Sequence, residues 1–184
     1  NWGLLELRIE ITKFLYRKYS LKYNPENEVL VTVGGSEAIE IAVKALISPD
    51  DEVLIPEPSF VCYVPIVEVA GGIPVIINTK EENGFKLTSD ELKMAITERT
   101  KMLVLPYPNN PTGAVLDKDE LEALAEVLSG TNIAVLSDEI YAELTYGKKH
   151  ISIANIEGMK ERTIIASGFS KAYAMTGWRL GYLI

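Results

Sequence analysis

The sequence predicts an α/β fold, a three-layer α/β/α sandwich with a mostly parallel sheet of about seven strands. Short apolar runs rich in β-branched residues alternate with segments of helical periodicity along nearly the whole chain. Most predicted strands are continuously apolar, as is typical of strands buried on both faces of a parallel sheet. The 184 residues are enough for one domain with a substantial core.

Seven apolar runs are expected to be the strands, and Gly, Pro or Ser residues bound most of them. In chain order these runs are 29–33, 52–55, 74–77, 102–105, 133–136, 163–166 and 180–184. Pro56 and Pro58 are expected to end the second strand, because proline cannot donate to a β-ladder.

Helical periodicity separates these runs. The first helix is expected at 4–19, where apolar residues recur at three- and four-residue spacing. Further helices are expected at 37–47, at 60–70 where Pro65 could introduce a kink, after Ser89 or Asp90 as N-cap, and at 117–128. Residues 141–159 predict no regular element.

Composition excludes several classes of function. The formal charge of −8, from 18 basic and 26 acidic residues, disfavours a nucleic-acid partner. No apolar run reaches the ~20 residues of a membrane span, and no signal peptide is visible. One cysteine and one histidine allow no internal disulfide, zinc spacing or Ser/His/Asp set, so we expect no metal and a cytoplasmic location.

The chain opens without methionine and stops inside an apolar, strand-like run. We therefore expect residues 1–184 to be one incomplete domain of a longer protein.

The stretch 167–182, SGFSKAYAMTGWRLGY, carries the first chemical signal. A desolvated lysine such as Lys171 loses its proton easily and then forms a Schiff base with an aldehyde. Arg179 offers a planar fork for a phosphate. Together they suggest pyridoxal phosphate, although most lysines and arginines near strand ends are simply solvated.

Three other turns follow predicted strands, where ligands of parallel sheets collect. Residues 34–37, GGSE, could bind phosphate at a helix start or form a plain turn capped by Ser36. Residues 109–113, NNPTG, could offer an amide donor or be an ordinary loop. Asp138 could pair with a protonated pyridine nitrogen, or be a surface ion pair or an N-cap. Phe60 or Tyr63, early in the helix after Pro58, could stack on a planar cofactor or pack in the core.

Taken together, these motifs resemble the large domain of class I/II pyridoxal-phosphate-dependent aminotransferases of fold type I. The most specific pieces are NNPTG at 109–113, SDEIY at 137–141 and SKAYAMTGWRLGY at 170–182. The resemblance covers nearly the whole chain and implies a domain that binds pyridoxal 5'-phosphate.

By this resemblance, five residues would hold the reactive ring. Lys171 would form the Schiff base and later move a proton, and Asp138 would pair with the ring nitrogen. Tyr141 and Asn110 would bind the oxygen of the 3-hydroxyl group, and Phe60 would stack on the ring.

Five further residues would hold the phosphate. Gly35, Ser36 and Glu37 would offer backbone N–H groups, with help from the Ser36 hydroxyl. Ser170 and Arg179 would complete the site.

The sequence departs from the family pattern at Gly168, where many relatives carry a serine three residues before the lysine. This leaves one phosphate contact without its usual hydroxyl.

The family implies transfer of an amino group between an amino acid and a 2-oxo acid, in a homodimer. A carbon–sulfur lyase on the same fold, or a non-catalytic effector domain of a regulator, would share the cofactor residues. Since parts that contact substrate would lie outside residues 1–184, we expect this segment alone to be inactive.

Overall fold

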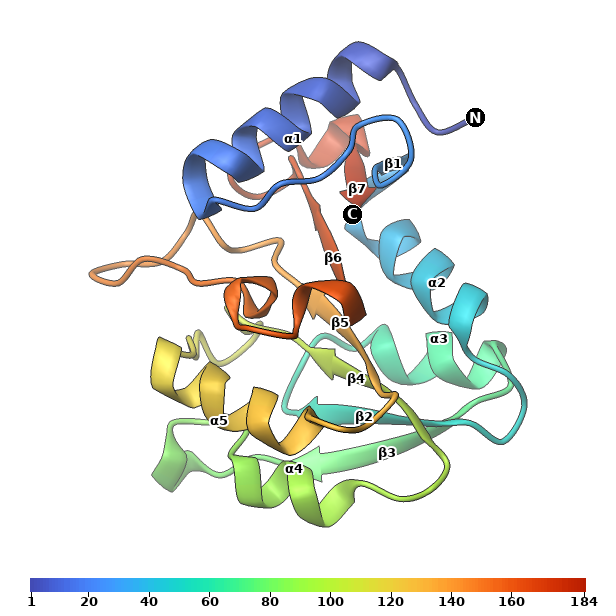
Figure 1. Cartoon of the computed structure of the whole chain (residues 1–184), viewed down its shortest axis with the longest axis vertical. Coiled ribbons are helices and arrows are strands. Elements are labelled where there is room, and N and C mark those ends of the chain that lie inside the picture. Colours follow the sequence, from blue (N-terminus) through green and yellow to red (C-terminus); the bar gives the residue numbers. More distant parts are fainter.

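The computed structural model describes all 184 residues and contains one seven-stranded sheet (Figure 1). Its strands lie in the order β1-β7-β6-β5-β4-β2-β3. Only β7 runs against its neighbours, and the other paired strands are parallel. The strands are β1 (Leu30–Thr32), β2 (Glu52–Glu57), β3 (Ile73–Asn78), β4 (Thr100–Leu105), β5 (Ala134–Asp138), β6 (Thr163–Gly168) and β7 (Gly181–Leu183).

Five α-helices cover the two faces of this sheet (Figure 1). They are α1 (Leu5–Tyr19), α2 (Gly34–Leu46), α3 (Tyr63–Val69), α4 (Ser89–Ala95) and α5 (Lys118–Leu128). Short 3₁₀ turns occur at Glu81–Asn83, Ile153–Asn155, Lys160–Arg162 and Thr176–Trp178. The predicted three-layer, mostly parallel architecture is confirmed.

Consecutive residues of a strand point to opposite faces of the sheet, so each buried strand contacts helices on both faces. In β2, Val53 and Ile55 pack in the core cluster of α2 and α3, whereas Leu54 packs with α4 and α5. In β6, Ala166 faces α2 and Ile165 faces α1. The helices α1, α4 and α5 therefore share one face, and α2 and α3 cover the other.

The strand β2 ends at Glu57, directly before Pro58, as expected, but the predictions for Pro56 and Pro65 were wrong. The strand β2 continues through Pro56, where the ladder with β3 persists but the recorded pairing with β4 ends at Leu54. The missing N–H of Pro56 therefore breaks no bond to β4. Pro65 lies in the first turn of α3, where a helix needs no N–H donor, so the helix begins at Tyr63 rather than at Phe60.

The caps of two helices are capping boxes. Thr88, rather than the predicted Ser89 or Asp90, caps α4 by accepting a hydrogen bond from the N–H of Glu91. Asp117 caps α5 in the same way with Glu120. The observed N-caps, Thr88 and Asp117, lie close to the helix starts that were predicted at Ser89 or Asp90 and at residue 117.

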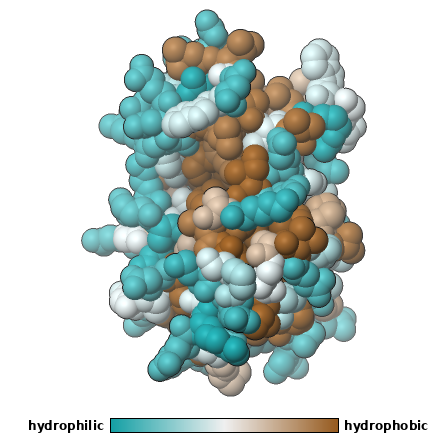
Figure 2. Space-filling model, turned by 90° about the vertical axis from the view of Figure 1, so that its right-hand side faces the viewer, coloured by the Kyte–Doolittle hydropathy of each residue, from teal (hydrophilic) through white to brown (hydrophobic).

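Figure 2 shows hydrophobic residues gathered along the middle of one face of the molecule, with hydrophilic residues around them. The exposed apolar side chains include Leu4, Val33, Val61 and Trp178. None of the helices combines the length and the apolar character needed to cross a membrane.

Candidate functional site

The predicted site residues meet at one edge of the sheet because the strands that carry them end there. The parallel strands β2, β4, β5 and β6 present their carboxyl ends at this edge, and β1 runs parallel to them. Because β7 is antiparallel, its beginning lies at the same edge, which places Arg179 there as well. This edge is where ligands of open α/β sheets bind.

A cavity of about 240 Å³ opens at this edge. Nine of the ten predicted site residues line it, namely Gly35, Ser36, Phe60, Asn110, Asp138, Tyr141, Ser170, Lys171 and Arg179. The structure therefore brings residues from six separate turns of the chain to one hollow.

Glu37 is the exception. Its carboxylate accepts a hydrogen bond from the backbone N–H of Val33, four residues earlier, and it does not line the cavity. The Glu37 side chain therefore stabilises the entry into α2. The alternative role of Ser36 as a helix cap is not observed either, because Val33 is the N-cap and makes no side-chain cap bond.

The first turn of α2 and the guanidinium of Arg179 form one end of the cavity. Gly34 has φ +79°, and a Cβ added to it would lie 2.4 Å from Nη2 of Arg179. Only glycine lets the guanidinium approach the helix start so closely. Arg179 donates to the carbonyl of Thr176 at 3.0 Å and remains exposed. A cation beside uncapped N–H groups of a helix start is suited to bind a phosphate.

Asp138 forms the opposite, buried end. One carboxylate oxygen accepts the phenol of Tyr63 at 2.7 Å, and the other accepts the N–H of Ile140 at 3.2 Å. Burial raises the pKa of Asp138, and the two hydrogen bonds only partly oppose this. No basic side chain forms an ion pair with Asp138. A cationic group in the cavity would supply the charge partner that this carboxylate lacks.

Tyr63 was considered from the sequence only as a ring that could stack on a cofactor, but in the structure its hydroxyl bonds to Asp138. Its side chain is 2% exposed, lines the cavity and packs edge-on against Phe60, with ring centroids 5.8 Å apart. Tyr63 lies three residues after Phe60 and so reaches the same cavity, at the start of α3. The three-residue spacing was visible, but the bond to Asp138 depends on how α3 packs on β5.

Lys171 follows β6 and lies near Tyr141, with Nζ 5.6 Å from the centroid of the tyrosine ring. The lysine is exposed, so residues 1–184 do not provide the desolvation that the sequence led us to expect around its amine. Ser170, the preceding residue, is buried and also lines the cavity. The amine is therefore free to reach a ligand in the cavity.

The two asparagines of the turn 109–113 have different roles. The side-chain oxygen of Asn109 accepts the N–H of Thr112 at 3.1 Å and its hydroxyl at 2.9 Å, so Asn109 shapes the turn. Asn110 is exposed and lines the cavity with a side chain that makes no hydrogen bond to the protein. This supports Asn110 as the ligand-binding member of the pair.

Gly168 has a structural explanation. A Cβ at this position would lie 2.9 Å from both Cα of Gly181 and the carbonyl oxygen of Leu180. The strands β6 and β7 approach too closely for a side chain there. Gly168 does not line the cavity.

A larger, mostly apolar cavity of about 300 Å³ lies beneath α1, on the other face of the sheet. Its lining comes mainly from α1 and from residues 165–175. The chemistry described above belongs to the smaller cavity, because the lysine, the arginine and the unpaired aspartate meet only there.

The comparisons with known proteins agree with this geometry. The sequence model described as "Aminotransferase class I and II" matches residues 1–184. The chain is 52% identical over 182 residues to the putative aminotransferase YugH of Bacillus subtilis, covering 99% of this chain and 47% of that protein. It is 47% identical over 184 residues to an aspartate aminotransferase of Pyrococcus abyssi, covering 100% of this chain and 47% of the relative.

Solved structures give the same result. An aromatic aminotransferase from Pyrococcus horikoshii superposes with a TM-score of 0.96 at 45% identity, over 99% of this chain and 49% of that one. An aspartate aminotransferase from Thermus thermophilus with maleate superposes with a TM-score of 0.94 at 42% identity. The match covers 99% of this chain and 47% of that one. The chain thus spans about half the length of the relatives it matches.

Proposed function

This chain belongs to the class I and II aminotransferases, and from that premise we propose that the protein transfers an amino group between an amino acid and a 2-oxo acid with pyridoxal 5'-phosphate as cofactor. One observation carries this proposal. The same cavity is lined by the amine of Lys171, by the buried carboxylate of Asp138, which has no ion-pair partner, and by Arg179, which lies against the start of α2. These groups match the aldehyde, the ring nitrogen and the phosphate of that cofactor.

We assign the holding roles as follows. Arg179, the N–H groups of Gly35 and Ser36, and Ser170 bind the phosphate, while Phe60 packs against the ring. Asp138, which keeps no cation of its own, stabilises a protonated ring nitrogen.

The reactive side of the ring belongs to three residues. Tyr141 and Asn110 donate hydrogen bonds to the ring oxygen. When bound, the cofactor supplies an aldehyde that condenses with amines and a ring that withdraws electrons from the substrate. Lys171 would be the amine that holds the cofactor, and its amine would also serve as the general base that moves the proton of the substrate Cα.

Relatives of similar identity are named for different substrates, including aspartate, aromatic amino acids and N-acetyl-LL-diaminopimelate. Similarity therefore does not select one amino acid, and the proposal is limited to the class. We further propose a cytoplasmic homodimer, supported by a single free cysteine and by exposed apolar side chains beside the cavity. Val33, Val61 and Trp178 are 59%, 80% and 75% exposed and lie within two residues of lining residues.

The test is to incubate the full-length protein with the cofactor, a panel of amino acids and a 2-oxo acid. We expect the oxo acid of the donor and the amino acid of the acceptor to form together, and Lys171→Ala to form neither. Ammonia and pyruvate from a sulfur-containing amino acid would instead indicate a carbon–sulfur lyase. Binding of the cofactor without any turnover would indicate an effector domain and overturn the proposal.

A further inference from the structure

Tyr141 lies in a part of the chain that no helix or strand stabilises. Residues 140–151 follow the end of β5 and contain no helix or strand. Two turn hydrogen bonds are present, from the N–H of Ala142 to Glu139 and from the N–H of Leu144 to Tyr141. Since a ring-binding phenol must be held within a narrow range of positions, other contacts have to fix this segment.

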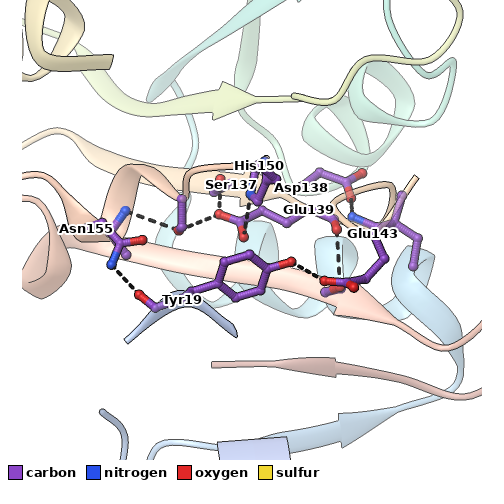
Figure 3. A network of polar contacts seen from close by, with 11 residues as sticks. Tyr19, Ser137, Asp138, Glu139, Glu143, His150 and Asn155 are labelled. Atoms are coloured by element: carbon purple, nitrogen blue, oxygen red, sulfur yellow. Dashed lines mark hydrogen bonds and ion pairs between the residues drawn. The ribbon is translucent and has the colours of Figure 1, made fainter. Parts of the chain in front are cut away.

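Glu139 closes both ends of the segment. Its buried carboxylate accepts hydrogen bonds from Ser137 at 3.0 Å and from Ser152 at 2.6 Å (Figure 3). Nε2 of His150 lies 3.0 Å from the other oxygen, in an ion-pair contact that lacks the alignment of a hydrogen bond. The side chains of His150 and Glu139 are 5% and 3% exposed. Glu139, two residues before Tyr141, therefore contacts His150 and Ser152 at the far end of the segment.

Glu143, two positions after Tyr141, is the second anchor. Its carboxylate accepts a hydrogen bond from the phenol of Tyr19 (Figure 3). It also accepts one from the amine of Lys18, at 2.7 Å. Burial opposes ionisation of Glu143, but these two donors outweigh it, so its pKa lies below the ordinary value.

The end of α1 joins the two anchors. The ring of Tyr19 also lies edge-on to His150, with centroids 5.6 Å apart. In addition, Asn155 donates a hydrogen bond of 2.7 Å to the carbonyl of Tyr19, which ties the end of α1 to the chain after the segment. Tyr19 therefore contacts Glu143 directly, and it contacts His150, which lies against Glu139.

We propose that Tyr19 is a positioning residue for the cofactor site, acting on Tyr141 through Glu143 and His150. This inference rests on the proposed function, because it takes Tyr141 to bind the ring oxygen of the cofactor. The two anchors flank Tyr141 symmetrically and face α1, while Tyr141 lines the cavity on the other side. Without the Tyr19 hydroxyl, Glu143 keeps only the half-exposed amine of Lys18 as a side-chain partner, and Tyr141 is held less firmly against the ring oxygen.

A double-mutant cycle on the full-length protein tests this, with the dissociation constant of pyridoxal 5'-phosphate as readout. We expect Tyr141→Phe to weaken binding roughly five-fold, as for one lost hydrogen bond, and Tyr19→Phe to weaken it by a similar or smaller factor. The double variant should bind no more weakly than Tyr141→Phe alone. With a cofactor analogue that lacks the 3-hydroxyl group, Tyr19→Phe and the unmodified protein should bind equally well.

Tyr23→Phe is the matched control, because the Tyr23 hydroxyl lies in the same core region and has no hydrogen-bond partner. Its dissociation constant should be unchanged. Additive losses in the double variant, or an unchanged constant for Tyr19→Phe, would overturn the inference while leaving the proposed function intact. If the unmodified protein fails to bind the cofactor, both are wrong.

Discussion

The phenol of Tyr63 donates a 2.7 Å hydrogen bond to Asp138 across the interface between α3 and the end of β5. Both residues are buried, and both line the cavity that holds the other candidate site residues. Burial raises the pKa of Asp138, whereas the hydrogen bond from Tyr63 opposes this and favours the carboxylate. Tyr63 therefore favours the ionised form of Asp138, the form that the proposed pairing with a cationic ring nitrogen requires.

Tyr63→Phe should weaken cofactor binding several-fold, because Asp138 loses the donor that favours its charged form. The dissociation constant of pyridoxal 5'-phosphate measures the loss. For an analogue in which carbon replaces the ring nitrogen, the variant and the unmodified protein should differ little. Tyr182→Phe removes a buried phenol on the α1 side of the sheet and is the control. An equal loss with both ligands would mean that Tyr63 only packs.

Asp138→Asn should stabilise the cofactor-free protein at neutral pH while weakening cofactor binding. Because the pKa of Asp138 is raised in the folded state, its stability contribution is present at low pH and is lost as pH rises through that pKa. The asparagine side chain carries no charge, so the variant avoids the cost of holding a buried carboxylate ionised at neutral pH. Each tenfold change in proton affinity corresponds to about 1.4 kcal/mol of stability. Urea unfolding should show a larger gain at neutral pH than at about pH 4. A gain that does not depend on pH would contradict this explanation.

Gly34→Ala should disrupt the phosphate end of the cavity. The new Cβ would lie 2.4 Å from Nη2 of Arg179, so the guanidinium must move and cofactor affinity should fall at least ten-fold. Gly113→Ala is matched to it, since Gly113 has φ +73° but nothing within 4 Å of the added Cβ. Both variants should lose about 1 kcal/mol of stability from backbone strain. Only Gly34→Ala should lose affinity, and equal losses of affinity would be evidence against the assigned role of Arg179.

Gly168→Ser would restore the residue that the family pattern led us to expect. The close contacts with Gly181 and Leu180 mean that the serine should destabilise the protein by about 1–3 kcal/mol, without improving cofactor affinity. Gly177→Ser, where the added atom meets nothing within 4 Å, should be tolerated. Chemical unfolding and cofactor titration of both variants decide this, and tighter binding by Gly168→Ser would refute the explanation.

The sequence predicted the architecture well because its signals are local. Apolar runs such as those of β4 and β5 have no polar interruption, and the capping box at Asp117 is visible in four residues. The residues that line the cavity were predictable because most of them lie at or just after the ends of parallel strands, which share one edge of the sheet, whereas Arg179 precedes the antiparallel β7.

What could not be predicted depends on contacts between distant segments. Glu37 was expected to offer its backbone N–H to a phosphate, but the bond from the N–H of Val33 to its side chain was not foreseen. The bond from Tyr63 to Asp138 joins residues 75 positions apart, and no periodicity indicates it. The segment 141–159 gave no pattern because its order comes from side-chain contacts: those of Glu139 with His150 and Ser152, and that of Glu143 with Tyr19 in α1.

The central claim is that Lys171 is the amine that binds the aldehyde of the cofactor. Its most direct test is borohydride reduction of the full-length protein with stoichiometric pyridoxal 5'-phosphate, followed by mass spectrometry of the peptides. We predict that the reduced cofactor is found on the peptide that contains Lys171, and that Lys171→Ala removes this label. Labelling spread over other surface lysines, with Lys171 unmodified, would contradict the account.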